Sequence, residues 1–366
     1  MSMRDAAIRR VAARAFEIPT DQPEADGTLS WDKTTIVVVE IEAGGATGLG
    51  YTYADASLVP LIADKLANVV AQHDAFDIVG VSDDLWRSVR NLGRGGLAAT
   101  AISAIDIALW DLKAKLLDVP LAMLLGRRRE RVPIYGSGGF TSYSDDTLRR
   151  QLASWVESDG CRWVKMKIGS EPEYDPLRVE VARRAIGDAG LFVDANGALT
   201  PQRAVALAER IAAQRVTWFE EPVTSDDPEG LAFVRMHAPT GMEITAGEYG
   251  YTLDDFAHLL ERPSIDVMQA DVTRCGGVSG FLQAAALCET HHIDLSGHCA
   301  PAAHRHVACA ALRLRHLEWF HDHVRIEHLF FEGAPQPKDG AIAPDLSMPG
   351  LGLHLKERDI ERFRVA

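Results

Sequence analysis

The last two-thirds of the sequence repeats a short apolar run followed by an amphipathic stretch. Eight runs occur from about residue 132 onward, and seven of them end in or near a lysine, a carboxylate or a histidine. These polar ends follow one another at intervals of about 20–28 residues, which is about one strand, one helix and two short loops. The runs are VPIYGSG (132–138), WVKMKIG (163–169), LFVDANG (191–197), TWFEEP (217–222), EITAGE (243–248), DVMQADVT (266–273), IDLSGH (293–298) and HLEWF (316–320). The pattern predicts an α/β barrel of the (β/α)8 type, with its chemistry at the carboxyl ends of the strands.

The first 125 or so residues have a different texture. Residues 10–17 and 34–43 read as strands, and the polar stretch from Thr20 to Lys33 between them reads as a loop. Four glycines then indicate a hairpin, and residues 57–72 and 98–117 have helical periodicity. The glycines are Gly44, Gly45, Gly48 and Gly50. Strands followed by helices predict a separate α+β domain.

Composition excludes several classes of function. A formal net charge of −14 argues against nucleic acid as a partner, because phosphate binding needs a basic surface. No stretch approaches 18 uncharged apolar residues, so we expect no membrane span. Residues 1–14 are charged throughout, which predicts no signal peptide. The five cysteines show no zinc-binding spacing, and we expect reduced thiols in a cytoplasmic protein.

Three carboxylates end three consecutive predicted strands. Asp194, Glu220 and Glu248 would converge on one side of the barrel mouth, where they would repel one another unless a cation held them. Ligands that are all oxygen suit Mg²⁺ or Mn²⁺ rather than Zn²⁺. Three separate ion pairs are the alternative, but three carboxylates in succession at this spacing favour a metal site.

Two lysines occupy the strand before these carboxylates. Lys165 and Lys167 are two residues apart, so both side chains would point into the barrel. Buried like charges disfavour protonation, and one lysine with a lowered pKa could act as a base. An exposed edge strand with solvated lysines is the alternative for the pair taken alone.

Asp271 and His298 end the two strands that follow the carboxylates. A histidine that acts as a base needs an acceptor to orient it, and a carboxylate on the adjacent strand can supply one. Glu318 ends the last strand and, if protonated, could donate a hydrogen bond to a developing enolate. Nearby histidines read by default as surface or supporting residues, namely His304, His306, His321 and His323.

Together these residues suit removal of a proton next to a carboxylate. That proton is a very weak acid, and a bound Mg²⁺ can stabilise the enediolate as a Lewis acid. A lysine on one side and a histidine on the other allow reprotonation on the opposite face or protonation of a departing β-hydroxyl.

The same residues resemble a known family. AISAIDIALWDLKAKLLDVPLAMLLG (101–126) resembles the helix signature of mandelate racemase and muconate lactonising enzymes, and VDANGALT (193–200) continuing to WFEEP (218–222) resembles their second signature. The Lys-x-Lys pair, the three carboxylates and the Asp–His pair are similar to the mandelate racemase subgroup of the enolase superfamily. The resemblance covers nearly the whole chain.

The resemblance implies a fold and a division into domains. It implies a modified (β/α)7β barrel over residues 129–345 and an α+β capping domain over residues 1–128. A C-terminal segment, residues 346–366, would return to the cap. It also implies a homo-oligomer.

The resemblance also implies a role for each polar residue. The three carboxylates would bind Mg²⁺, with Mn²⁺ as an alternative. Lys167 would be one acid/base, with its pKa lowered by Lys165. His298, oriented by Asp271, would be the other, and Glu318 would assist at the substrate carboxylate.

Specificity in this family comes from cap loops that close over the barrel. Here these would be residues 18–33 and 50–56, whose charged and hydroxyl side chains suit a polyhydroxylated substrate. The residues expected at the substrate are Asn196, Trp31, Tyr53 and His321.

The reaction expected is dehydration of a sugar acid to a 2-keto-3-deoxy acid. Racemisation, epimerisation and cycloisomerisation remain open, because the same residues serve all of them. Two other classes are a barrel aldolase with a Schiff base on Lys167 and a non-catalytic sugar-acid-binding protein. The three carboxylates argue against the first, and the retained acid/base residues argue against the second.

Overall fold

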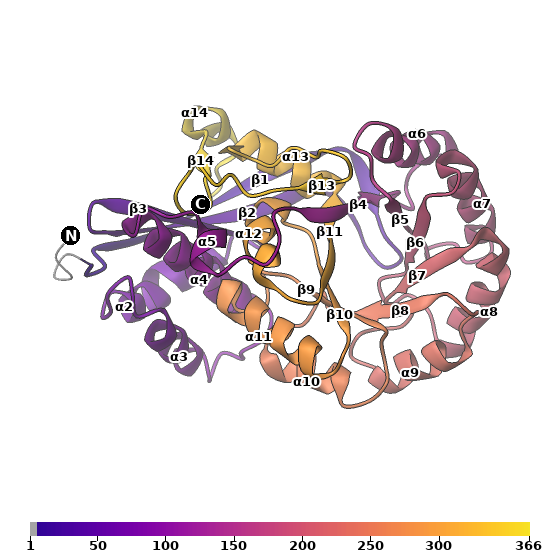
Figure 1. Cartoon of the computed structure of the whole chain (residues 1–366), viewed down its shortest axis with the longest axis horizontal. Coiled ribbons are helices and arrows are strands. Elements are labelled where there is room, and N and C mark those ends of the chain that lie inside the picture. The colour runs from indigo at the N-terminus through magenta and orange to yellow at the C-terminus, as the bar shows by residue number, and fades with distance from the viewer. Residues whose placement is uncertain (1–5) are drawn as a thin grey trace.

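The eight apolar runs form the eight parallel strands of a closed barrel. The computed structural model describes residues 6–366, and in it the last barrel strand pairs with the first (Figure 1). The strands are β4 (Val132–Gly138), β5 (Trp163–Lys167), β6 (Gly190–Asp194), β7 (Val216–Glu220), β8 (Glu243–Ala246), β9 (Val267–Ala270), β10 (Asp294–Gly297) and β11 (Leu314–Phe320). The predicted barrel is confirmed, and each strand lies within or next to its predicted run.

A helix follows each barrel strand and packs outside it. These helices are α6 (Asp145–Glu157), α7 (Asp175–Ile186), α8 (Pro201–Ile211), α9 (Pro228–His237), α10 (Leu253–Leu260), α11 (Gly277–Thr290), α12 (Pro301–Ala310) and α13 (His321–Phe330). Local sequence explains where several begin. The side chain of Ser144 accepts a hydrogen bond from the backbone N–H of Thr147, and Thr252 forms a capping box with Asp255. Proline occupies the first turn of α7, α8, α9 and α12, where its missing N–H costs nothing.

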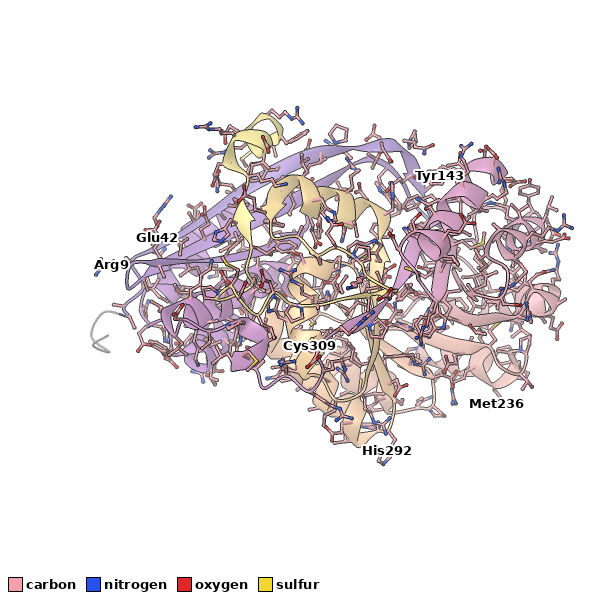
Figure 2. The ribbon with its side chains drawn as sticks, turned by 45° about the horizontal axis from the view of Figure 1, so that its top comes forward. Arg9, Glu42, Tyr143, Met236, His292 and Cys309 are labelled. Atoms are coloured by element: carbon pink, nitrogen blue, oxygen red, sulfur yellow. The ribbon has the colours of Figure 1, made fainter. Side chains whose placement is uncertain are left out.

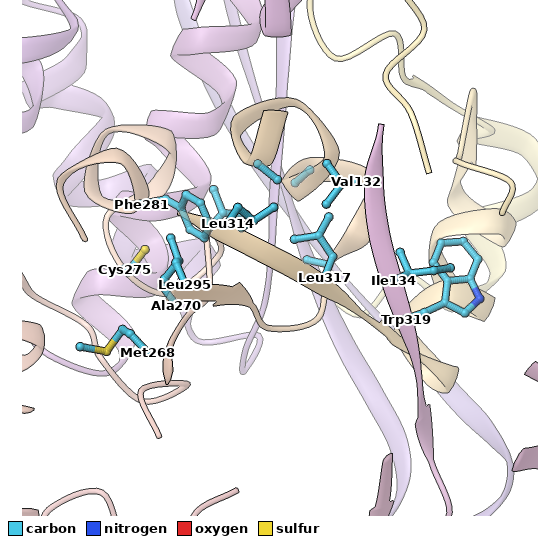
Figure 3. Packing of buried hydrophobic residues seen from close by; sticks show 14 of the residues in the cluster. Val132, Ile134, Met268, Ala270, Cys275, Phe281, Leu295, Leu314, Leu317 and Trp319 are labelled. Carbon is cyan, nitrogen blue, oxygen red and sulfur yellow. The ribbon is translucent and has the colours of Figure 1, made fainter. Parts of the chain in front are cut away.

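The pleat of the strands divides the barrel residues into an outer and an inner set. The outer residues belong to a large apolar cluster, and Figure 3 shows Ile134 beside Trp319 and Leu317 near Val132 in it. The inner residues form two layers. Aromatic rings fill the lower layer, where Tyr135 and Trp218 surround His316. Lysines and carboxylates fill the upper layer at the mouth, which positions the site.

The N-terminal domain is a three-stranded antiparallel sheet with helices behind it. Its strands are β1 (Arg10–Ala25), β2 (Ser30–Ala43) and β3 (Ala46–Tyr53), and its helices are α1 (Leu58–Pro60), the π-helix η2 (Leu61–Leu66), α2 (Ala67–Val70), α3 (Ile78–Ser88), α4 (Leu97–Leu116) and α5 (Leu121–Leu124). Arg9 and Glu42 lie at the end of this cap remote from the barrel, whereas Met236 and His292 lie on the barrel's outer edge (Figure 2).

The predicted loop from Thr20 to Lys33 is wrong. β1 and β2 continue through most of it, and only residues 26–29 form the turn. The pairing of β1 with β2 is interrupted between Pro19 and Glu24 and then resumes. The hairpin bends at this interruption. The extended hairpin reaches from the cap to the barrel (Figure 1).

Two of the four glycines predicted for the β2–β3 hairpin lie outside its turn and have a packing role. Gly44 and Gly45 form the turn, but Gly48 and Gly50 lie inside β3 against α4. A Cβ on Gly48 would lie 2.1 Å from the carbonyl oxygen of Ala108, and one on Gly50 would lie 2.0 Å from that of Ala104. These glycines therefore let the sheet and the helix approach closely.

The cap is joined to the barrel by buried hydrogen bonds. The Tyr51 hydroxyl donates to Glu327 Oε1 (2.5 Å) and the Thr52 hydroxyl donates to the Thr273 carbonyl (2.7 Å). Residues 50–52 are thus buried strand, and Tyr53 ends the strand half-buried, so the first part of the loop predicted over 50–56 is wrong. A second contact joins α4 to α11, where Ser279 donates to both carboxylate oxygens of Asp106.

The C-terminal residues lie against β1 of the cap. The backbone N–H of Val365 donates to the carbonyl of Ala15, and that of Ala15 donates to the carbonyl of Ala366. The remaining short elements are β12 (Phe331–Glu332), β13 (Ala341–Ile342), β14 (His354–Leu355), α14 (Glu357–Ile360) and the 3₁₀ turns η3 (Ala212–Gln214) and η4 (Glu361–Phe363). The predicted boundaries at 128 and 345 fall between α5 and β4 and after β13.

Two expectations from composition can be compared with the fold. Within residues 6–366, no helix has the length and apolar character needed to cross a membrane. The five cysteines are all buried and unpaired. Residues 1–5 of the charged N-terminal segment lie outside the described part of the chain.

Candidate active site

Three buried carboxylates meet at the barrel mouth. Asp194 and Glu220 are the last residues of β6 and β7, and Glu248 stands two residues beyond β8. One oxygen from each lies within 4.8 Å of the others. The sequence predicted this convergence, and an all-oxygen set of this kind fits Mg²⁺ or Mn²⁺.

The charges of these carboxylates are only partly balanced by protein groups. Burial and then Asp194 raise the pKa of Glu220 to about 8, although Lys165 lowers it. Glu248 Oε2 is buried and accepts no well-aligned hydrogen bond from the described residues, and its charged neighbour is His298, whose Nε2 lies 3.1 Å away. An under-coordinated oxygen beside two further carboxylates is a donor set that a divalent cation would complete.

Lys165 is fully buried beneath the carboxylates. Its Nζ lies 2.5 Å from Glu220 Oε1, 2.9 Å from Glu318 Oε1 and 3.3 Å from Asp194 Oδ2. Burial alone would lower the pKa of Lys165, but Glu220 and Glu318 raise it well above its ordinary value. Lys165 is therefore a fixed positive charge at the base of the cluster.

Lys167 stands beside the first carboxylate. Its Nζ donates to Asp194 Oδ2 (2.6 Å) and to Asn196 Oδ1 (3.0 Å). Burial and the charge of Lys165 lower the pKa of Lys167, but the raising effect of Asp194 prevails. The lowered pKa expected from the lysine pair is thus not found while Asp194 serves as the partner of the lysine.

His298 stands on the other side, one residue beyond β10. Its Nδ1 lies 2.8 Å from Asp271 Oδ2, and its Nε2 lies 3.1 Å from Glu248 Oε2. The backbone N–H and hydroxyl of Thr273 donate to the second oxygen of Asp271 and hold this carboxylate in place. Burial would raise the pKa of Asp271, but His298 lowers it, so the aspartate is ionised.

Glu318 closes the mouth between the lysines and His298. Its Oε1 accepts from the Ser137 hydroxyl (2.6 Å), and its Oε2 lies 3.5 Å from His298 Nε2. Burial would raise its pKa, but Lys165 and His298 lower it. The protonated Glu318 considered from the sequence is therefore not favoured, and the group is a carboxylate.

The four residues expected at the substrate are not all in the mouth. Asn196 is there, bonded to Lys167, with its backbone in the left-handed region (φ 45°). Trp31 donates to Glu24 (2.9 Å) within the cap hairpin, and His321 lies 3.0 Å from Asp21. Tyr53 stacks on His323. Contact of these three with a substrate stays a prediction.

Three of the histidines expected to be surface or supporting residues are buried. Desolvation lowers the pKa of His304, and it lowers the pKa of His306 and of His323 to about 3. His304 supports the mouth, because its Nε2 accepts from the backbone N–H of Val272 next to Asp271. A surface position for these three histidines is therefore wrong.

A cleft of about 860 Å³ borders the metal-ligand loops. Asn196, Gly197 and Glu221 line its inner part, and the hairpin residue Thr28 lines it from the cap. Hydroxyl, amide and carboxylate groups predominate among the polar lining side chains.

Comparison with known proteins covers both domains. Residues 10–126 match the N-terminal domain of mandelate racemase / muconate lactonizing enzyme, and residues 147–359 match the enolase C-terminal domain-like family. The chain belongs to this family of the enolase superfamily. The resemblance stated from the signatures and from the Lys, Asp/Glu and Asp–His residues is therefore confirmed.

Three relatives show how far the similarity extends. A mandelate racemase/muconate lactonizing enzyme-like protein from Rubrobacter xylanophilus is 48% identical, with a TM-score of 0.95 over 98% of this chain and 99% of that one. The 3,6-anhydro-alpha-L-galactonate cycloisomerase of Streptomyces coelicolor is 33% identical over 98% of this chain and 99% of its own. The L-talarate/galactarate dehydratase of Salmonella typhimurium is 33% identical over 78% of this chain and 74% of its own. A crystal structure of a dehydratase of that name and organism, liganded with Mg and L-lyxarohydroxamate, has a TM-score of 0.88 at 28% identity, covering 98% and 93%.

This enolase-superfamily enzyme has further mouth residues that the sequence reasoning missed. Arg274 donates to the Glu248 carbonyl (3.1 Å) and lies 3.7 Å from Asp271 Oδ2. Glu221 is buried, has φ 35° and leaves Oε1 without a hydrogen-bonding partner in the described chain. Glu221 could have been predicted, because it directly follows the predicted metal ligand Glu220 in the sequence. The sequence gives no such indication for Arg274 beyond its position three residues after Asp271.

Proposed function

We propose that this enzyme removes the proton α to the carboxylate of a sugar acid and then eliminates the β-hydroxyl. One observation carries the proposal. Two groups that can transfer protons approach a single carboxylate cluster from different sides, Lys167 at Asp194 (2.6 Å) and His298 at Glu248 (3.1 Å). A substrate carboxylate held between them would present its α-carbon to both.

Asp194, Glu220 and Glu248 are the residues that would hold Mg²⁺, as their oxygen donors fit. Bound there, Mg²⁺ would polarise the substrate carboxylate and replace Lys167 and His298 as the counter-charge of these ligands. Lys165, fixed by Glu220 and Glu318, would add positive charge beneath the developing enediolate.

The two proton-transfer groups differ in the step each would perform. Lys167 or His298 takes the α-proton, and His298 delivers a proton to the departing hydroxyl. Asp271 keeps the Nδ1 proton of His298 in place, so Nε2 is the atom that exchanges protons with the substrate. The product is an enol that becomes a 2-keto-3-deoxy acid.

The choice of a sugar acid rests on two observations. The curated relatives include dehydratases and cycloisomerases named for such acids. Asn196, Thr224 and Ser225 line the cleft beside the metal-ligand loops, and their side chains can hydrogen-bond to hydroxyl groups.

Cycloisomerisation is the second candidate. The cycloisomerase of Streptomyces coelicolor aligns over 98% of this chain, a larger share than the Salmonella dehydratase. In that case the β-oxygen that departs from the enediolate would belong to a ring of the substrate. Its C–O bond would break and the oxygen would take a proton, so the ring would open without loss of water.

Proton NMR in D₂O with a panel of mono- and diacid sugars and added Mg²⁺ tests the proposal. Loss of the α-proton signal together with a 2-keto-3-deoxy product is expected. Exchange of the α-proton without loss of water would contradict dehydration and favour epimerisation or cycloisomerisation. No exchange across the panel would contradict the sugar-acid proposal, and borohydride trapping of Lys167 would instead support an aldolase.

We also expect a homo-oligomer located in the cytoplasm, on the family resemblance and on the reduced cysteines. Light scattering of the purified chain tests the first expectation, and fractionation of the source cells tests the second.

A further inference from the structure

Cys299 lies beside the proposed catalytic histidine. Its Sγ is 3.3 Å from His298 Nε2 and 3.4 Å from Glu318 Oε2, and the histidine nitrogen is 3.5 Å from the same carboxylate oxygen. One nitrogen, one sulfur and one oxygen therefore form a nearly equilateral triangle. In residues 6–366 this is the one such cluster of three ligand side chains that includes a thiol.

The triangle has the dimensions of one face of a tetrahedral metal site. Zinc bonds of about 2.0–2.1 Å to nitrogen, about 2.3 Å to sulfur and about 2.0–2.2 Å to oxygen place such ligands about 3.4–3.6 Å apart. Two of the three separations in the protein, 3.4 and 3.5 Å, lie within this range, and the 3.3 Å between sulfur and nitrogen is just below it. A fourth position would remain for water.

We propose that His298, Cys299 and Glu318 form a second metal site, selective for Zn²⁺, whose occupation inhibits the enzyme. The ligand types distinguish it from the carboxylate cluster. Imidazole and thiolate favour Zn²⁺, whereas the three oxygens of Asp194, Glu220 and Glu248 favour Mg²⁺.

The surroundings hold the three ligands in place. The backbone N–H of Cys299 donates to Glu318 Oε2 (3.1 Å), while Ser137 and Lys165 occupy the other oxygen. Asp271 fixes the His298 ring through Nδ1 and leaves Nε2 between the thiol of Cys299 (3.3 Å) and Glu248 Oε2 (3.1 Å). Cys299 itself has a left-handed backbone (φ 51°), a conformation uncommon for residues other than glycine. A site with ligands fixed in advance needs little rearrangement to bind a metal.

Metal binding and inhibition are separate consequences. When Zn²⁺ binds, the Cys299 thiol and the imidazolium form of His298, at Nε2, lose their protons to the solvent. The thiolate then bonds to the metal, with no change in oxidation state. The metal also takes the lone pair of His298 Nε2, the atom assigned to proton transfer. Inhibition thus rests on the proposed function, but binding does not.

Co²⁺ tests the binding without turnover. The full-length protein, saturated with Mg²⁺, is titrated with Co²⁺, and thiolate ligation gives a near-ultraviolet charge-transfer band that oxygen ligands cannot give. We expect the band at one equivalent in the wild type and in Cys309→Ser, a control with another buried thiol. It should be absent in Cys299→Ser.

The decisive outcomes are distinct. No band in the wild type, or a band that persists in Cys299→Ser, would overturn the site. If Cys299→Ser does not fold, His298→Asn serves instead, because it removes the nitrogen ligand and should weaken Co²⁺ binding at least 10-fold.

Zn²⁺ tests the inhibition in turnover assays with excess Mg²⁺. We expect Zn²⁺ to inhibit the wild type reversibly, with release by a chelator followed by fresh Mg²⁺. In Cys299→Ser the half-inhibitory Zn²⁺ concentration should rise at least 10-fold relative to Cys309→Ser. Equal inhibition of both variants would show that Zn²⁺ acts elsewhere, for example by displacing Mg²⁺.

Discussion

The lysine side and the histidine side of the mouth are built differently. Lys167 is held only at its reactive atom, whose partners are Asp194 and Asn196. His298 is held at the nitrogen that does not face the cluster, by Asp271 at 2.8 Å. Its other nitrogen is left to meet Glu248.

This difference separates orientation from reactivity. Any change that releases Lys167 for chemistry also removes the contacts that position it. The histidine keeps its orientation when its contacts at Nε2 change, because Asp271 binds the opposite nitrogen. We therefore expect the histidine side to have a dedicated positioning residue and the lysine side to depend on the metal ligands.

Removal of the divalent cation should have the largest effect and should affect both sides. EDTA treatment is expected to abolish α-proton exchange, because no Lewis acid would then stabilise the enediolate. Since that contribution amounts to several kcal/mol, the loss should be about 10³-fold or more. Exchange is measured by NMR before and after Mg²⁺ is returned. Activity that survives EDTA would contradict a metal-dependent reaction on either side.

Replacement of each acid/base residue in turn should distinguish the contribution of the lysine side from that of the histidine side. Lys167→Ala and His298→Asn are each expected to lower kcat about 10²–10⁴-fold, the usual contribution of one acid/base group. With substrates epimeric at the α-carbon, each variant should lose exchange with the epimer whose proton faces the missing group. The readout is deuterium incorporation for both epimers.

Lys33→Ala is the control for loss of a lysine, since Lys33 pairs with Glu17 on the cap surface. If both variants retain full activity, the mechanism is wrong. If both lose the same epimer, the two groups do not lie on opposite faces.

Asp271→Asn should have a smaller effect, limited to the histidine side. The amide can still occupy the space, but it no longer favours the tautomer and charge that keep Nε2 available. We expect kcat to fall about 10–100-fold for the epimer that uses His298, with KM and the Lys167-dependent epimer little changed. Asp294→Asn, at the opposite end of the barrel, is the matched control. An equal loss on both sides would indicate general damage to the mouth.

The barrel could be predicted because its signal repeats. Alternation of apolar runs and helices fixes which residues face outward, and the outer set does form the core around the barrel. The cap hairpin was harder, since Pro19 and Glu24 flank an interruption in pairing and the segment is polar. Its strands continue because contacts with the barrel stabilise them. The hydrophobic pattern within the segment does not indicate those contacts.

The candidate site likewise has one part that the sequence predicts and another part that it does not. Residues at strand ends, such as Asp194 and His298, could be found by counting. Protonation states could not, because they depend on distances of 2.5–2.9 Å between side chains from different strands, as between Lys165 and its partners Glu220 and Glu318. Arg274 and Cys299 escaped for a related reason, since each also contacts a residue near the end of another strand. Arg274 donates to the Glu248 carbonyl, 26 residues away, and Cys299 lies beside Glu318, 19 residues away.

The smallest effect should come from the joint between cap and barrel, where neither side of the mouth is touched. Asp106 is buried in α4, and burial raises its pKa to about 7, although the hydrogen bonds from Ser279 lower it. Between pH of about 4 and 7 the folded chain then keeps a proton that the unfolded chain has lost. The free energy of unfolding should fall as pH rises through that window and become level above it.

Asp106→Asn removes this titration with little change in shape. The amide oxygen can still accept from the Ser279 N–H, and the amide nitrogen can donate to the Ser279 hydroxyl. Between pH 5 and 7.5 we expect the stability of the variant relative to the wild type to increase by on the order of 1–3 kcal/mol, measured by urea denaturation at each pH. A constant difference across that range would mean that Asp106 is ionised in the folded protein. Exchange of both epimers should stay at the wild-type level, because Asp106 supports the cap and contacts neither Lys167 nor His298.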